Sequence, residues 1–152
     1  MTASDSGGGR RAAATLAPIR RSFELFNAGD LETIFDEIFD RDIDYSGDPD
    51  ISALAGSPVD LRGIDAVRSV WRSFFEMFDE IRLSEVEFEE MGPGPAVGRA
   101  HLVARGGSSD VPIDALFHFA WAVRGGRETF MAAKLDRAAP LAALADHVAG
   151  RR

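Results

Sequence analysis

The sequence predicts an α+β fold in which a curved antiparallel or mixed sheet wraps around three N-terminal helices, forming a cone with an internal pocket. The apolar residues follow a helical period as far as residue 78 and then alternate with a period of two, as strands do. The last long strand before the final hairpin is apolar on both faces, whereas an antiparallel sheet usually leaves one face in water. The chain also holds 11 Phe against one Tyr, which favours an interior that is rich in rings or partly hollow.

The length and composition of the chain are those of one globular domain. At 152 residues the chain can bury a single core. We expect a disordered Gly- and Ser-rich tail over residues 1–12 and one domain over residues 13–148. The net charge of −8 argues against a nucleic-acid partner. The sequence shows neither a secretory signal nor an apolar run of the ~20 residues that a membrane span needs, so we expect no membrane partner and a cytoplasmic location.

Residue types that hold metals or phosphates are scarce or badly spaced. Cysteine is absent, which excludes disulfides, thiolate nucleophiles and zinc–thiolate sites. His101, His118 and His147 show no spacing typical of a metal site. The glycine run 7–9 precedes no strand–helix unit, so it is not a phosphate loop. We therefore expect no metal and no cofactor.

Three helices are predicted before the sheet. The face that the first helix buries carries Leu16, Ile19, Phe23 and Phe26. Gly29 supplies its C-terminal cap, and Asp30 is placed to cap a second helix with an apolar stripe over 31–39. Asp65 is expected to cap the third helix, whose apolar residues over 67–78 have a helical period.

The strands follow from alternation and turn residues. They are predicted at Asp42–Ser46, Val59–Arg62, from Ile81 onward, Val97–Arg105, Val111–Val123 and Glu128–Leu135. A turn-rich loop over 47–58 separates the first two. The alternation changes phase at Ser84-Glu85, which predicts a β-bulge. Gly125-Gly126 predicts a hairpin, and Pro140 the start of a short C-terminal helix.

The strand over 116–123 has two different apolar faces. One face carries Leu116, His118, Ala120 and Ala122. Because this face is small and holds a polar group, we expect it to border the pocket. The other face carries Phe117, Phe119 and Trp121, whose large side chains need a cover. A second copy of the chain is the simplest cover, so we expect a homodimer through this face.

Four segments, taken in order, resemble the SnoaL-like family of the nuclear transport factor 2-like superfamily. They are residues 23–31 (FELFNAGDL), residues 42–45 (DIDY), residues 62–67 (RGIDAV) and the hairpin spacing from Trp121 to Ala138. The resemblance runs from about residue 16 to residue 145. It implies a cone-shaped fold with a pocket at its wide end and dimers through the convex sheet face. It defines no reaction, because this fold hosts isomerases, cyclases, hydrolases, dehydratases and members without a known activity.

Two specialised reactions of the superfamily are disfavoured. The resemblance to steroid Δ-isomerases places their two oxyanion donors at Ser22 and His118 and their base at Asp48, and two of these three roles have changed residue type. Residues 99–101 (RAH) resemble the Arg-x-Asp of limonene-epoxide hydrolases, but the aspartate is absent. Their second aspartate is replaced by small residues near Ala132.

The candidate catalytic residues are His118, Asp48 and Tyr45. A histidine on the pocket side of a central strand can serve as a general acid or base, although a buried histidine satisfied by a neighbour such as Ser22 is the alternative. Asp48 and Tyr45 come from the region that usually rims the opening, where a rim aromatic with no ligand role is equally open. The candidate ligand-binding residues are Ser22, Phe26, Trp71, Phe75, Leu116, Ala120 and Met131. Core packing is the alternative for the residues of the third helix.

The sequence thus predicts a protein that binds a small apolar molecule. Such a protein is either an isomerase, cyclase or hydrolase that works by acid/base chemistry without a cofactor, or a non-catalytic binding or interaction domain. The two are separated by whether the pocket holds two polar groups of complementary protonation near one point.

Overall fold

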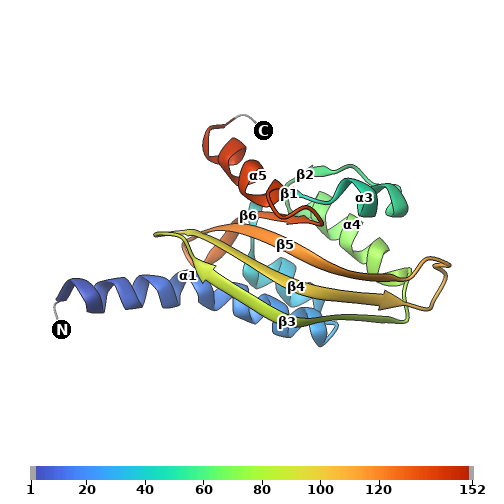
Figure 1. Ribbon diagram of the computed structural model, residues 1–152, viewed down its shortest axis with the longest axis horizontal. Coiled ribbons are helices and arrows are strands. Elements are labelled where there is room, and N and C mark those ends of the chain that lie inside the picture. Colours follow the sequence, from blue (N-terminus) through green and yellow to red (C-terminus); the bar gives the residue numbers. More distant parts are fainter. Residues whose placement is uncertain (1–2, 151–152) are drawn as a thin grey trace.

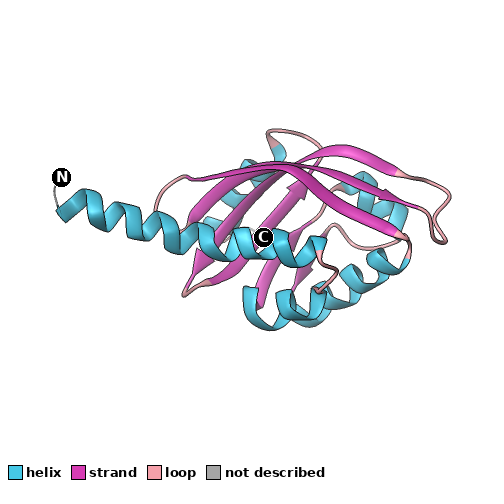
Figure 2. Cartoon of the chain, turned by 90° about the horizontal axis from the view of Figure 1, so that it is seen from below, coloured by secondary structure: helices cyan, strands magenta, loops and turns pink. Residues whose placement is uncertain are grey.

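A six-stranded curved sheet covers α1 and α4 on one side and carries α5 on the other (Figures 1 and 2). The computed structural model describes the backbone of residues 3–150 and the side chains of residues 14–150. The helices are α1 (Ala3–Asn27), α2 (Leu31–Thr33), the π-helical η1 (Ile34–Ile38), α3 (Pro49–Ala55), α4 (Ile64–Glu76) and α5 (Ala139–Val148). The strands are β1 (Phe39–Ser46), β2 (Asp60–Arg62), β3 (Glu80–Glu90), β4 (Pro95–Arg105), β5 (Ile113–Arg124) and β6 (Arg127–Lys134).

The strand order is β2-β1-β6-β5-β4-β3. β1 and β6 run parallel, and the other neighbouring pairs are antiparallel. The sheet is therefore mixed, and the predicted α+β cone is confirmed. Within residues 3–150, no helix is both long enough and apolar enough to pass through a bilayer.

The first helix packs as its spacing predicts. Ile19 and Phe23 are buried, and Gly29, in the left-handed region (φ 74°), ends the helix. The Asp30 carboxylate caps α2 by accepting a hydrogen bond from the Thr33 backbone N–H (3.1 Å). The backbone is helical from Ala3 onward, so the part of residues 1–12 that is described is helical where the sequence predicts a disordered tail. The alanine-rich run 12–14 favours extending a helix that the following turns already nucleate.

Two local predictions before the third helix are corrected. The predicted loop over 47–58 contains α3, because Asp48 caps it, Pro49 occupies its first turn and Gly56 ends it in the left-handed region. Asp65 does not cap α4. Gly63 is the N-cap, and Asp65 lies in the first turn, where a negative charge is favourable.

The predicted bulge in β3 is confirmed. The pairing of β3 with β4 shifts between Ser84 and Glu87, and Glu85 has a positive φ of 52°. The predicted hairpin at Gly125-Gly126 is confirmed as well, with both glycines at positive φ between β5 and β6.

The two faces of β5 are the reverse of the prediction. Phe117, Phe119 and Trp121 are between 1% and 6% exposed and face the helices inside the cone. Leu116, at 42% exposure, lies on the outer face. Ala120 also lies there and packs under Leu144 of α5. Alternation shows that the two faces differ but does not say which one turns inward, and the cover that the large side chains need comes from the chain's own helices.

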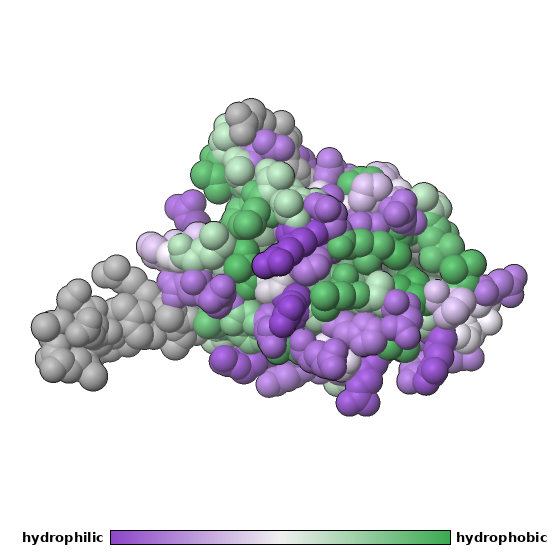
Figure 3. Space-filling model, in the orientation of Figure 1, coloured by the Kyte–Doolittle hydropathy of each residue, from purple (hydrophilic) through white to green (hydrophobic). Residues whose placement is uncertain are grey.

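The predicted dimer surface of Phe117, Phe119 and Trp121 is therefore wrong, since these residues form an inner wall. The homodimer itself stays a prediction. On the face seen in Figure 3, hydrophilic and apolar residues interleave, and apolar residues gather beside α5 and toward α3 and α4.

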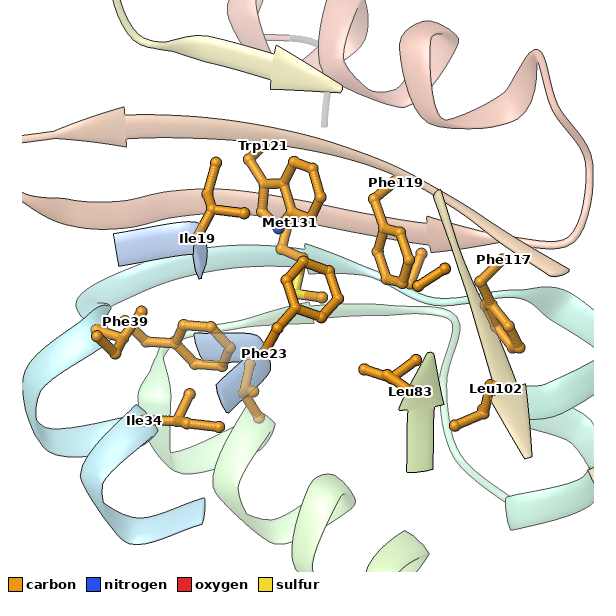
Figure 4. Packing of buried hydrophobic residues seen from close by; sticks show 14 of the residues in the cluster. Ile19, Phe23, Ile34, Phe39, Leu83, Leu102, Phe117, Phe119, Trp121 and Met131 are labelled. Atoms are coloured by element: carbon orange, nitrogen blue, oxygen red, sulfur yellow. The ribbon is translucent and has the colours of Figure 1, made fainter. Parts of the chain in front are cut away.

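An aromatic cluster joins α1 to the sheet. Trp121 stacks on Phe119 with their ring centroids 5.3 Å apart, and Phe23 meets Trp121 edge to face at 5.9 Å (Figure 4). The Trp121 ring lies over Gly98 of β4, where a Cβ atom would approach it to 3.0 Å and the Glu87 carbonyl to 2.5 Å. Glycine at position 98 therefore makes room for the indole.

Candidate functional site

A cavity of about 110 Å³ lies between the inner face of the sheet and the helices. Its aromatic lining residues are Phe23, Phe26, Phe39, Tyr45, Trp71, Phe74, Phe75, Phe117, Phe119 and Trp121. Its polar side chains belong to Ser22, Tyr45, Asp48, Ser52 and Ser57. Among the described residues, the lining contains no Lys, Arg or His. The site is thus a ring-lined chamber with few polar groups.

Seven of the ten predicted site residues line this cavity. They are Ser22, Phe26, Tyr45, Asp48, Trp71, Phe75 and Met131. Phe26, Trp71 and Phe75 were found because a helical period identifies the inward face of a helix, whereas Ser22 was placed by the resemblance to steroid isomerases. Leu116, His118 and Ala120 do not line it, because they lie on the outer face of β5.

His118 is paired with Arg99 of β4 and Lys134 of β6, on the outer side of the sheet. It is half-buried there and separated from the cavity by the sheet itself. The predicted acid/base role of His118 inside the pocket is therefore wrong. The reason is the reversal of the two faces of β5.

Tyr45 brings a phenolic hydroxyl to the pocket wall. It lies on β1, with its ring edge to face with Trp71 at a centroid distance of 5.8 Å. Burial raises the pKa of Tyr45 to about 12, an interaction with Trp71 lowers it in part, and the charge of Asp48 raises it further. The hydroxyl thus keeps its proton at neutral pH and is a hydrogen-bond donor.

Asp48 is engaged by backbone groups. One carboxylate oxygen accepts from the N–H of Asp50 (2.9 Å) and of Ile51 (3.2 Å), and the other accepts from the N–H of Leu135 (2.9 Å). These bonds cap α3 and tie it to the segment after β6. Although Asp48 lines the pocket, its geometry favours a structural role over that of a base.

Glu128 is the functional candidate that the sequence reasoning missed. It is fully buried, and burial raises the pKa of its carboxyl to about 8, while the Ser22 hydroxyl lowers it in part. Neither carboxyl oxygen has a hydrogen-bond partner among the described residues. The Ser22 hydroxyl itself donates to the Ile19 carbonyl (2.7 Å). A buried carboxyl without a partner is rare enough to require an explanation.

A bulge turns Glu128 inward. β5 and β6 pair Ala122 with Phe130 but Val123 with Glu128, so Thr129 is an extra residue in β6. Without it, Glu128 would share the outer face with Phe130. With it, Glu128 lies on the inner face beside Val123. Strand alternation in the sequence carries no sign of this bulge.

A second polar cluster lies on the outer face under α5. His147 Nδ1 is 2.8 Å from a carboxylate oxygen of Asp44, and the His147 ring stacks on Phe130 at a centroid distance of 4.6 Å. Arg62 pairs with the same carboxylate at 3.4 Å. The two contacts of His147 fasten α5 to β1 and β6. Among the side chains of residues 14–150, no three His, Asp or Glu come together as a group able to hold a metal ion.

Comparison with known proteins extends this picture. A family model described as SnoaL-like domain matches residues 19–131. No curated protein sequence matches the chain.

Solved structures share the fold. An NTF2-like protein of unknown function from Burkholderia pseudomallei is 22% identical with a TM-score of 0.68, over 83% of this chain and 93% of that one. A protein of Xanthomonas campestris pv. campestris, described by a proposed polyketide cyclase activity, is 12% identical with a TM-score of 0.69, over 83% and 93%. TerC, co-crystallized with polyporic acid, is 20% identical with a TM-score of 0.67, over 83% and 94%. At these identities, the similarity shows the fold alone.

Proposed function

Because the chain belongs to the SnoaL-like family and holds a ring-lined chamber inside its cone, we propose that it binds a small, uncharged, largely apolar molecule there. The composition of the wall carries the proposal. Ligand sites are concave and mainly apolar, with a few placed polar groups, and the combination of Phe and Trp rings with the Tyr45 hydroxyl has that character.

The size of the cavity sets the scale of the ligand. At about 110 Å³ it approaches the engineered apolar cavity of ~150 Å³ that binds benzene. One ring with a short substituent therefore matches the chamber in this conformation. A longer molecule would have to extend past Ser57 and Pro58, which line the pocket together with α3.

The charge of the wall selects against ionised ligands. A carboxylate would find no cationic side chain among the described lining residues, and burying an unpaired charge is strongly unfavourable. A cation would find only Asp48, whose oxygens are engaged by three backbone N–H groups. A neutral ligand is the remaining class.

Acid/base catalysis without a cofactor, as an isomerase, cyclase or hydrolase, is the second candidate. Glu128 favours it, since a buried carboxyl with a raised pKa beside a pocket is typical of a general acid or base. Tyr45 and Asp48 both line the pocket, but the three backbone hydrogen bonds that Asp48 accepts weaken it as a base. Among the described residues, Asp48 is the one carboxylate that lines the pocket, and backbone N–H groups engage both of its oxygens, so binding is the better supported function.

Binding is tested by titrating the protein with α-methylstyrene and following the indole N–H signals by NMR. The chain has two Trp, and both line the pocket, so both signals should shift. Ala133→Leu places a larger side chain in the cavity and should abolish the shifts. His118→Ala, on the outer face, is the matched control and should leave them unchanged. Absence of binding to the unmodified protein, or equal effects of the two variants, would contradict the proposal.

A further inference from the structure

Two side chains on the inner face of β5 and β6 carry buried polar atoms that have no hydrogen-bond partner among the described residues. They are Trp121, through its indole N–H, and Glu128, through both carboxyl oxygens. Trp121 is 1% exposed and Glu128 is 0% exposed. An unpaired buried donor or acceptor costs about 1–3 kcal/mol, so two neighbouring ones indicate a missing partner.

These two residues are neighbours on the inner face of the sheet, and Trp121 lines the pocket. Trp121 pairs with Met131 across the strands, and two residues further along β5, Val123 pairs with Glu128. Trp121 and Glu128 are therefore diagonal neighbours on the same face, within reach of each other's long side chains. In Figure 4 the indole nitrogen lies on the ring edge that points toward Met131, into the interior.

Glu128 does not itself line the cavity, but three of its neighbours do. Ser22 of α1 is near enough to affect the pKa of its carboxyl, Phe39 of β1 is its partner in the parallel ladder, and Trp121 is its diagonal neighbour. All three residues line the cavity, and none of them carries a charge. Glu128 stands directly behind them. The burial that raises its pKa to about 8 keeps the carboxyl protonated at neutral pH.

We propose that Trp121 and Glu128, with Ser22 beside them, form a polar subsite that binds the carbonyl oxygen of a small ketone whose apolar part fills the aromatic chamber. This inference rests on the proposed binding function and names its ligand class. The indole N–H is only a donor, and the protonated carboxyl presents a second donor. A carbonyl oxygen has two lone pairs and no hydrogen, so it accepts from both donors at once.

The matched probes are acetophenone and α-methylstyrene, which share one skeleton and differ in C=O against C=CH₂. Dissociation constants are measured at pH 7 from the indole N–H shifts, using the Trp71 signal for the Trp121→Phe variant. We expect Glu128→Leu and Trp121→Phe each to weaken acetophenone binding about tenfold relative to α-methylstyrene. Glu89→Leu, a change at an exposed carboxylate of β3, should leave the ratio of the two constants unchanged.

The Glu128→Gln variant tests whether the side chain at position 128 acts on the ligand as a hydrogen-bond donor or only fills space. Its amide N–H can still donate, so acetophenone binding at pH 7 should stay within about threefold of the unmodified protein. The unmodified protein should lose acetophenone affinity as the pH rises through about 8, because Glu128 then gives up its proton, whereas the Gln variant should not.

The outcomes distinguish the two proposals. If α-methylstyrene binds but the ratio is the same in the unmodified protein, Glu128→Leu and Trp121→Phe, the carbonyl subsite is wrong while the pocket stands. If neither probe binds, the binding function fails, and the subsite fails with it.

Discussion

The two faces of the sheet bury polar groups in opposite ways. On the outer face, Lys134 donates to the Ser46 hydroxyl (2.7 Å) and to the Gly47 carbonyl, and His147 bonds Asp44 under α5. On the inner face, Trp121 and Glu128 bury polar atoms that have no partner among the described residues. The hydrogen bonds of the outer groups hold the fold together, whereas the polar atoms of Trp121 and Glu128 are those for which we propose a ligand carbonyl as the partner.

The same contrast explains why the prediction that His118 lies in the pocket was wrong. His118 pairs with Arg99 and Lys134 in the neighbouring strands, on the face of the sheet that α5 and solvent cover. The carboxyl of Glu128 lies on the inner face instead, because a one-residue bulge at Thr129 reverses the side on which residue 128 lies. A polar residue in a central strand is thus no guide to a site until the direction of its face is known.

Among the variants that test this difference between the two faces, we expect Glu128→Gln to change the free energy of unfolding most. The pKa is about 8 in the folded chain against 4.5 ordinarily, so the unmodified protein loses stability as the pH rises from 4.5 to 8 and is level above that range. The Gln variant should therefore be more stable at pH 9, on the order of 4–5 kcal/mol, and nearly equal to the unmodified protein at pH 4.5. Urea unfolding at the two pH values measures this. An equal difference at both would show that the carboxyl does not titrate in the interior.

Lys134→Met tests the outer face. The change removes an amine that is buried and bonded to Ser46 and Gly47, and we expect it to lower the free energy of unfolding by about 3 kcal/mol. Binding of α-methylstyrene, measured by NMR at a temperature where the variant is folded, should be unchanged. Loss of binding without loss of stability would break the division between structural and ligand-facing polar groups.

Gly98→Ala tests the packing of the Trp121 indole ring over residue 98. The new Cβ would meet the Glu87 carbonyl and the indole ring at less than normal contact distances, so we expect a loss of about 1–3 kcal/mol. The Trp121 indole signal should shift while that of Trp71 stays in place. Thermal unfolding and the NMR spectrum check both points, and an unperturbed indole signal would contradict the proposed packing.

The smallest expected effect is that of His147→Ala. It removes the hydrogen bond to Asp44 and the stack on Phe130, which should cost about 1 kcal/mol, with no change in probe binding. Chemical denaturation compares the His147→Ala variant with the His118→Ala variant, since His118 makes neither of these contacts. Equal stabilities for the two variants would remove the role assigned to the His147–Asp44 pair.

The sequence predicted the fold and the helical part of the pocket well. A helix has one inward stripe, so the apolar period over α1 and α4 placed Phe26, Trp71 and Phe75 correctly. The Asp30 cap and the bulge beside Glu85 followed from local residue preferences and from a visible change of phase.

The rest depended on tertiary structure. In β5 both faces are apolar, so the choice between Phe119 and His118 as the inner residue required knowing which helices cover which side. In β6 the bulge at Thr129 reversed Glu128 without any change in the pattern of residue types. The interior carboxyl was for that reason invisible in the sequence.

The most direct test of the binding pocket is the position of bound α-methylstyrene, read from intermolecular NOEs to assigned side chains. The inner-face account predicts NOEs from the probe to the Met131 methyl group and to the Trp121 and Phe119 rings. NOEs to Leu116 or His118 on the outer face, or saturable binding without contacts to Met131 and Trp121, would contradict it.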